Sequence, residues 1–290
     1  MCPPNSVDIC LSHIVNRQGP SDTRDNMDMD LSYPNFTLRS YQQLIEALNG
    51  RWQIIRLCDA FATFKPDSLI LRHDIDISPT LALPMAEIEN SVGIRSTYFV
   101  GLHLSYNPHH PRQAKIVRTI AEMGHEIGFH YDGLVYPGDG ASLEENLALL
   151  NRHIQILEEV CSRRVVSIAR HNPSIAKEGD PFKTAVKYNN AYDERLFQNT
   201  LYISDSCGAW RAGGLSPCWH EPRPKRVYLL IHAEQWADRS DADRMVRFEI
   251  MRERAMREHD AFFNEVRCVW RSHAGGKEHD ERVAFTKDGQ

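Results

Sequence analysis

Short apolar runs alternate with segments of helical periodicity along most of this chain. In SYQQLIEALN (residues 40–49) apolar side chains recur at helical spacing, which predicts a helix that begins after Thr37 and ends at Gly50. The same spacing predicts helices over residues 81–92, 111–123 and 142–161. Apolar runs predict buried strands over residues 68–72, 96–101, 126–130, 165–169, 201–204 and 227–231.

Strands that alternate with helices favour a parallel sheet with right-handed crossovers. The strand sequences LIL and YLLI are apolar throughout, as in a sheet that is buried on both faces. In such folds the functional side chains gather at the carboxyl ends of the strands. The expected fold class is therefore α/β with a parallel sheet.

Composition divides the chain into three parts. Residues 1–35 are rich in Asp, Asn, Ser and Pro, and we expect a loosely ordered extension there. Residues 36–273 are expected to form a single domain that includes a charged helical segment over 240–273. That segment packs along the outside of the domain in one interpretation and forms a homodimer interface in the other. Residues 274–290 are expected to be a disordered tail.

Charge and composition exclude several classes of protein. Charged residues make up 25% of the chain and hydrophobic ones 42%, as in an ordinary soluble enzyme. The formal charge is -5 and no basic stripe is evident, so nucleic acid is not an expected partner. Neither a signal peptide nor a membrane-spanning run is evident, which indicates a cytoplasmic protein. Seven widely spaced cysteines without a C-x-x-C pair argue against a cysteine zinc site.

Two aspartates follow the first predicted strand, in the sequence HDID. Asp74 and Asp76 are two positions apart, so their side chains point to the same face of an extended chain. Carboxylates this close repel each other, and a divalent cation relieves the repulsion. One of them can then bind a metal while the other acts as a general base. A turn that leaves the strand is the alternative.

Histidines close two further strands. His130 ends the third strand, and a neutral imidazole suits zinc, manganese, iron, cobalt or nickel. Asp132 is a further ligand or a group that orients His130. His171 follows the fourth strand as another candidate ligand, and the adjacent Arg170 is expected to pair with the free aspartate. A hydrogen-bonded structural histidine and an ordinary polar turn are the alternatives at these positions.

Polar and aromatic residues follow the last two strands. Asp205 and Trp210 come after the fifth strand, where an aromatic ring can form the wall of a sugar site. A surface loop is the alternative there. His232 ends the sixth strand and can act as a general acid that protonates a leaving amine. Trp236 follows closely and is expected to shape the pocket.

Taken in order, these motifs resemble those of the polysaccharide deacetylase superfamily, the NodB-homology fold, over roughly residues 66–236. The resemblance implies an irregular (β/α) barrel of parallel strands that removes acetyl groups from sugars with a metal-bound water. By this resemblance Asp74 is the catalytic base and Asp76 a metal ligand. GHEIGFH, which ends at His130, resembles the stretch that carries the first metal histidine.

The later motifs complete the resemblance. Arg170 lies at the start of RHNP, where the family has its arginine and proline motif. Asp205 and Trp210 resemble the fourth motif, and LIH, which ends at His232, resembles the last. HDID and GHEIGFHYD look like an atypical branch associated with surface-polysaccharide biosynthesis.

One position departs from the family pattern. The second metal histidine of the family lies four residues after the first, and here Leu134 occupies that position. Either His171 or Asp132 completes the site, or metal is weakly bound or absent. The departure leaves two alternatives open, a metal-independent hydrolase of cyclic amides of the allantoin type and a catalytically inactive carbohydrate-binding protein.

The leading interpretation is a cytoplasmic hydrolase that removes an acetyl group from an acetamido sugar or a nucleotide-linked precursor. Zinc is the expected metal, with manganese, cobalt and nickel as other candidates. The residues expected to act are Asp74, His232 and Arg170 in catalysis, Asp76, His130 and His171 in metal binding, and Asp132, Asp205, Trp210 and Trp236 in substrate binding.

Overall fold

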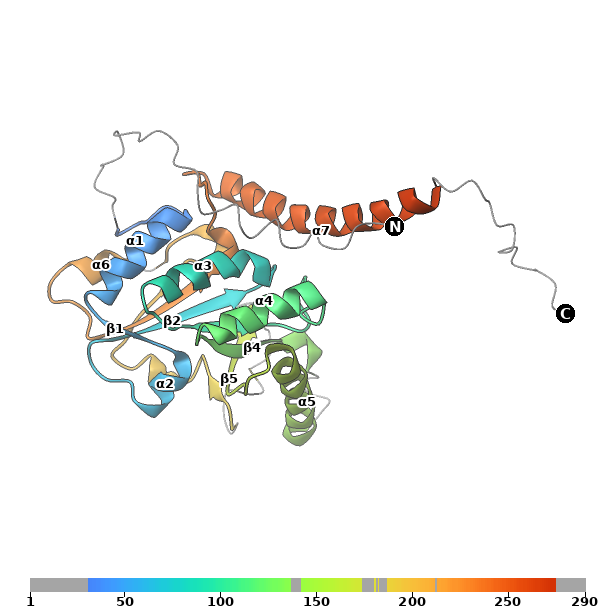
Figure 1. The fold of residues 1–290 in the computed structure, drawn as a ribbon. Coiled ribbons are helices and arrows are strands. Elements are labelled where there is room, and N and C mark those ends of the chain that lie inside the picture. Colours follow the sequence, from blue (N-terminus) through green and yellow to red (C-terminus); the bar gives the residue numbers. More distant parts are fainter. Residues whose placement is uncertain are drawn as a thin grey trace, which may run out of the picture. The chain divides into compact units, whose positions relative to one another are not determined.

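Strand β2 (Ser68–Ile75) lies inside a sheet of parallel strands in this computed structural model (Figure 1). The structure describes residues 31–136, 142–173, 180, 182, 187–211 and 213–274. The strand order is β6-β5-β4-β3-β2-β8-β7, and β1 pairs with β2 off this path. The other strands are β1 (Gln53–Ile55), β3 (Thr97–Val100), β4 (Glu126–Asp132), β5 (Ser167–His171), β6 (Asn189–Asn190), β7 (Leu201–Ser204) and β8 (Arg226–His232).

Strand β2 pairs with other strands along both of its edges, so neighbouring strands flank its carboxyl end. Along one edge β8 pairs with β2 over Ser68–Asp74. Along the other edge β1 pairs with residues 68–70 and β3 with residues 72–75. The predicted α/β class is confirmed. Within the described residues β6 and β7 do not pair, so the sheet is a curled half-barrel that stays open between these two strands.

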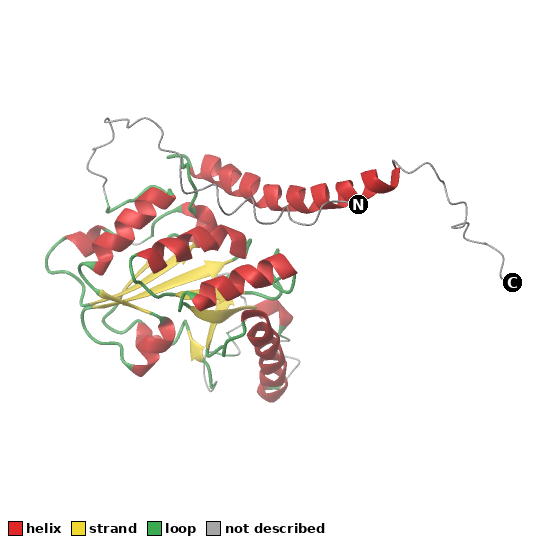
Figure 2. Cartoon of the chain, in the orientation of Figure 1, coloured by secondary structure: helices red, strands yellow, loops and turns green. Residues whose placement is uncertain are grey.

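Helices cover the outer face of this sheet (Figure 2). The helices are α1 (Leu38–Asn49), α2 (Leu57–Ala62), α3 (Pro79–Ser91), α4 (Pro111–Glu122), α5 (Leu143–Cys161), α6 (Ser216–Trp219) and α7 (Arg244–Ala274). Apolar residues of α1, α3, α4 and α5 form one buried cluster with alternate strand residues such as Leu69 and Leu71. The intervening residues, such as Ile70 and Phe99, belong to a smaller cluster on the inner face. The helix predicted after Thr37 is confirmed, since the Thr37 side chain caps α1.

The segment before α1 corrects the predicted domain boundary. Residues 31–35 were expected to belong to a loose extension, but their backbone carbonyls accept hydrogen bonds from the domain. Trp219 Nε1 donates to Leu31 O at 2.9 Å, and Trp210 Nε1 donates to Pro34 O at 3.1 Å. The domain therefore begins at least as early as Leu31. Residues 1–30 and 275–290, the rest of the two predicted disordered ends, lie outside the described residues.

Helix α7 packs on the domain through hydrogen bonds. Arg254 Nη1 donates to the backbone oxygens of Glu234 and Trp236, and Ser78 Oγ donates to Glu258 Oε2 at 2.6 Å. These contacts agree with packing against the domain, and homodimerisation stays a prediction. Among the described helices, none combines the length and the apolar character that crossing a membrane requires.

A buried carboxylate joins α3 to the outer face of the sheet. Glu89 is fully buried and accepts hydrogen bonds from the hydroxyls of Tyr41, Ser96 and Tyr98. His73 Nε2 of β2 lies 2.6 Å from Glu89 Oε1. Burial opposes ionisation, but the histidines and these hydrogen bonds outweigh it and lower the pKa of Glu89 to about 2. The carboxylate thus holds α1, α3, β2 and β3 together.

We expect Glu89→Ala to lower the free energy of unfolding by about 3–5 kcal/mol, because it leaves buried polar partners unpaired. Urea denaturation measures this loss. Glu122→Ala, a change at an exposed position at the end of α4, is the control and should stay within about 0.5 kcal/mol of the wild type. A Glu89→Ala variant as stable as this control would contradict the role given to the carboxylate.

Candidate active site

The carboxyl ends of β2, β4, β5 and β8 surround a cavity of about 960 Å³. Because alternate residues of a strand share a face, Arg72 and Asp74 lie on the same inner face as Ile70. All six residues predicted to act in catalysis or metal binding line the cavity, namely Asp74, Asp76, His130, Arg170, His171 and His232. The expectation that the polar motifs meet at one edge of the sheet is therefore confirmed.

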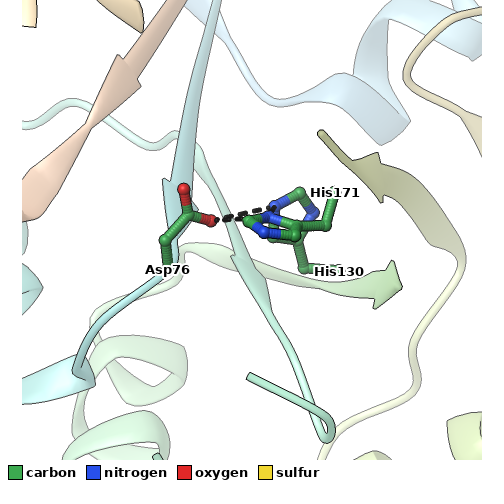
Figure 3. Close-up of side chains that lie close together, drawn as sticks. All are labelled: Asp76, His130 and His171. Carbon is green, nitrogen blue, oxygen red and sulfur yellow. Dashed lines mark hydrogen bonds and ion pairs between the residues drawn. The ribbon is translucent and has the colours of Figure 1, made fainter. Parts of the chain in front are cut away.

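Three of these side chains form a compact group of potential metal ligands (Figure 3). Asp76 Oδ1 lies 3.1 Å from His130 Nε2 and 3.2 Å from His171 Nδ1. The two histidine nitrogens lie 3.3 Å from each other. Hydrogen bonds from both histidines outweigh burial and lower the pKa of Asp76. Hydrogen bonding to Asp76 in turn raises the pKa of His171.

The donor set fits a divalent metal. One ligand atom from each residue of the group lies within 4.8 Å of the others, and two imidazoles with one carboxylate are a common ligand set for zinc and related metals. His130 Nδ1 lies 3.0 Å from Ala169 O, and donation there leaves Nε2 free to bind a metal. His171, rather than Asp132, is thus the residue that the fold supplies near Asp76 and His130. The side chain of Leu134, which occupies the position of the second metal histidine in the family pattern, is 93% exposed.

Asp74 is held by an arginine from its own strand. Arg72 donates to both carboxylate oxygens, from Nε at 2.8 Å and from Nη2 at 2.7 Å. The Arg72 side chain is fully buried and also donates to the hydroxyls of Tyr192 at 2.9 Å and Tyr228 at 3.2 Å. Burial would raise the pKa of Asp74, but the Arg72 charge outweighs burial and lowers it. The ion pair keeps Asp74 a carboxylate beside His130, whose Nε2 is 3.7 Å away.

The structure gives Arg170 a different position from the one expected. Adjacent strand residues point to opposite faces, and Ile168 belongs to the outer cluster while Ala169 belongs to the inner one. Arg170 therefore leaves β5 on the outer side, where its guanidinium lies so close to Gly133 that a Cβ there would be 2.5 Å from Nη2. Arg170 still borders the cavity, but the pairing with Asp74 predicted for it is made by Arg72.

His232 is oriented by a buried aspartate. The ring Nδ1 lies 2.7 Å from Asp205 Oδ1, and the backbone N–H of His232 donates to the same oxygen at 3.0 Å. Trp236 Nε1 donates to the other oxygen at 3.1 Å. Burial would lower the pKa of His232, but the hydrogen bond and charge of Asp205 outweigh it and raise the pKa to about 10. His232 is therefore protonated at neutral pH.

The side chains predicted to contact substrate are placed elsewhere. Asp205 and Trp236 are fully buried. Asp205 contacts the His232 ring, and Trp236 donates a hydrogen bond to Asp205. Trp210 Nε1 donates to Pro34 O, and its ring stacks on Phe36 with centroids 5.8 Å apart. Asp132 Oδ1 accepts from the backbone N–H of Leu134 at 2.9 Å and so caps the turn η1 (Gly133–Val135). The described lining of the cavity includes none of the four predicted substrate-binding residues, and their role in substrate binding stays a prediction.

Two buried charged residues at the site were missed in the sequence. Arg72 could have been found from its spacing, since a residue two positions before Asp74 shares its face of the strand. Glu234 lies in the turn η4 (Ala233–Gln235), lines the cavity and is only 3% exposed. Burial, with the nearby Asp76 charge, raises the pKa of Glu234 to about 8. No periodic pattern marks a residue in such a turn, so the sequence carried no signal for it.

Asp205→Asn removes the charge that raises the pKa of His232, so we expect this pKa to fall from about 10 towards 6.5. His232 binds its proton more tightly in the folded state than in the unfolded state, which stabilises the folded wild type. This stabilisation is complete below pH 6.5 and is lost as the pH rises through about 10. The stability advantage of the wild type over Asp205→Asn should therefore shrink over this range. Urea denaturation at several pH values and NMR titration of His232 test it, and a wild-type His232 that titrates near 6.5 would contradict the assignment.

No protein-family model matches the sequence, and no curated protein matches it. Solved structures resemble it at low identity. A CE4 family pseudoenzyme from Bacillus anthracis is 13% identical, with 66% of this chain and 60% of that chain covered and a TM-score of 0.36. A chitin deacetylase from the fungal pathogen Colletotrichum lindemuthianum is 11% identical over 66% of this chain and 83% of that chain, with a TM-score of 0.40.

A peptidoglycan deacetylase from Bacillus subtilis is 16% identical over 72% of this chain and 98% of that chain, with a TM-score of 0.36. For the first matches the aligned part spans less than two thirds of the other chain, 60% in the Bacillus anthracis protein. These proteins are carbohydrate deacetylases or a CE4 pseudoenzyme, the class that the sequence motifs resemble. At such low similarity the function has to be argued from the side chains of the site.

Proposed function

We propose that the protein is a metal-dependent hydrolase that removes an acetyl group from an acetamido sugar. The observation that carries the proposal is the arrangement of one ionised carboxylate, one protonated histidine and a three-residue donor set around a single cavity. Amide hydrolysis needs a base for the attacking water and an acid for the leaving nitrogen. The site offers both on the neighbouring strands β2 and β8, in the cavity that also holds the group of metal ligands.

Asp76, His130 and His171 would hold the metal, with zinc as the expected ion and manganese, cobalt or nickel as alternatives. When bound, a divalent ion supplies Lewis acidity, which polarises a carbonyl and makes a nucleophilic water available near neutral pH. His130 is already oriented for this task by the Ala169 carbonyl. The ligand His171 takes over the role that the family pattern gives to the position of Leu134.

Asp74 is the general base in this proposal, and Arg72 is the residue that keeps it ionised and aligned. The carboxylate accepts the proton of the attacking water, because its low pKa leaves it unprotonated at neutral pH. His232 donates a proton from Nε2 to the leaving nitrogen, since Nδ1 is held by Asp205. Opposite protonation states of the two groups at neutral pH match these two roles.

The substrate class rests on the motifs as well as on the site. A carbohydrate, or a nucleotide-linked or lipid-linked precursor of one, agrees with the resemblance to deacetylases associated with surface polysaccharides. Metal-independent hydrolysis of a cyclic amide and carbohydrate binding without turnover are the competing functions. Metal-independent hydrolysis predicts turnover that persists in chelator. Carbohydrate binding without turnover predicts that the wild type binds saccharide and forms no product.

We expect Asp74→Asn to lower kcat for hydrolysis of N-acetylglucosamine oligomers by about 10²–10⁴-fold, because the amide cannot accept the proton. Asp67→Asn is the matched control. Asp67 precedes the same strand at its opposite end, is exposed, and has the positive φ of 62° that asparagine also tolerates. Released acetate measures the rate, and circular dichroism checks that both variants fold.

Removal of metal by a chelator should abolish turnover in the wild type, and re-addition of zinc should restore it. Turnover that persists in chelator would favour the cyclic-amide class of hydrolase. Full activity in Asp74→Asn would contradict the assignment of the base. Saccharide binding without product in the metal-loaded wild type would favour an inactive binding protein.

A further inference from the structure

One wall of the catalytic cavity is apolar and comes from helix α7. Met245, Phe248 and Met251 line the same cavity as the metal-ligand group. Their spacing of three residues places them on one side of the helix. Leu230 of β8 continues this wall towards the catalytic groups, since it lies two residues before His232 on the same face of the strand. The cavity that holds His232 is thus lined by apolar side chains from both β8 and α7.

This wall is fixed in place on both sides. Arg247 donates to the backbone oxygens of Gly208, Asp241 and Ala242, and its guanidinium lies 4.8 Å from the Phe36 ring centroid. Further along the helix, Arg254 donates to backbone oxygens of the turn after His232. The apolar side chains thus lie on a segment of α7 that is anchored to the domain.

The same side chains are unusually open to solvent. Met245 is 60% exposed and Phe248 is 47% exposed at the edge of the cavity. Contiguous exposed apolar groups beside a cleft are typical of a binding site. Methionine side chains adapt to flexible apolar ligands because they are unbranched and polarisable. The wall is suited to an aliphatic chain.

A bare sugar ring is a poorer match for this wall. Sugar sites commonly use flat aromatic rings as a stacking surface, and two tryptophans near the site were candidates for that. Trp236 is fully buried behind His232, and Trp210 is engaged with Phe36 and Pro34. Tyr192 and Tyr202 also line the cavity, but the Arg72 guanidinium lies 4.7 Å from the Tyr192 ring centroid, and the Tyr202 ring packs against Phe197 and Tyr228. The α7 wall adds methionines and one phenylalanine to this lining.

We propose that the enzyme removes an acyl group longer than acetyl, and that the aliphatic chain of this group lies along Leu230, Phe248 and Met251. This inference rests on the hydrolytic chemistry of the proposed function, and it replaces the acetyl group of the substrate by an extended acyl chain on an amino sugar. Hydrolysis adds water across the amide, breaks the C–N bond and gives a carboxylic acid and a free amine. The chain must start at the reacting carbonyl beside His232, and Leu230 lies two residues before His232 on the same face of β8.

The test is a series of N-acyl glucosamines from acetyl to octanoyl, assayed with the metal-loaded full-length protein. In the wild type we expect kcat/KM to rise about threefold to fourfold for each added methylene, the factor that corresponds to ~0.8 kcal/mol per buried CH₂. In Phe248→Ser combined with Met251→Ser this dependence on chain length should be lost. Met256→Ser is the matched control, because Met256 is exposed on the same helix and does not line the cavity.

The outcomes separate this inference from the proposed function. Hydrolysis of the acetyl compound with rates that stay level or fall as the chain lengthens overturns the inference and leaves the deacetylase function in place. No hydrolysis at any chain length overturns both.

An octyl glycoside of N-acetylglucosamine provides a second experiment. A gain with this compound, and none along the N-acyl series, would place the aliphatic chain on the sugar and overturn the acyl assignment.

Discussion

Strand β2 carries ionisable side chains on both faces of the sheet, and much of the surrounding structure serves to pair them. Buried charges without partners are costly, so each must be satisfied by a neighbouring element. On the inner face, Arg72 forms a bidentate pair with Asp74 and is surrounded by tyrosines. On the outer face, His73 pairs with Glu89 of α3. The alternation of side chains along one strand thus separates a structural network from a catalytic one.

The two carboxylates at the end of β2 have different partners, which match the different roles proposed for them. Asp74 is held ionised by a charge from its own strand, whereas Asp76 faces two histidines supplied by β4 and β5. His232 has the opposite bias, because Asp205 stabilises its protonated form. The proposed base and one proposed metal ligand come from the end of β2, and the two histidine ligands and the proposed proton donor come from β4, β5 and β8. They meet because the strands are parallel. Helix α7 then adds an apolar wall to an otherwise polar site.

Much of this arrangement could be predicted from the sequence. The apolar runs identified the long strands, and strand-end positions identified Asp74, Asp76, His130, His171 and His232. Short elements such as β1 and β6 have too few residues to show a periodic pattern. Arg170 was expected to pair with the free aspartate, whereas Arg72, two positions before Asp74 on the same face of β2, makes this pair. The orientation of Trp210 and Trp236 depends on distant backbone and carboxylate acceptors, which no local pattern reveals.

We propose that His171 supplies the ligand that the deacetylase motifs place at the position of Leu134, in a metal site with Asp76 and His130. The most direct test is metal content by plasma mass spectrometry on the purified wild type, on His171→Ala and on Asp132→Ala, each after exposure to zinc, manganese, cobalt and nickel. The account predicts about one equivalent of metal in the wild type and in Asp132→Ala, and a loss of metal in His171→Ala. A wild type that binds no metal, or a His171→Ala variant that retains it, would contradict the account.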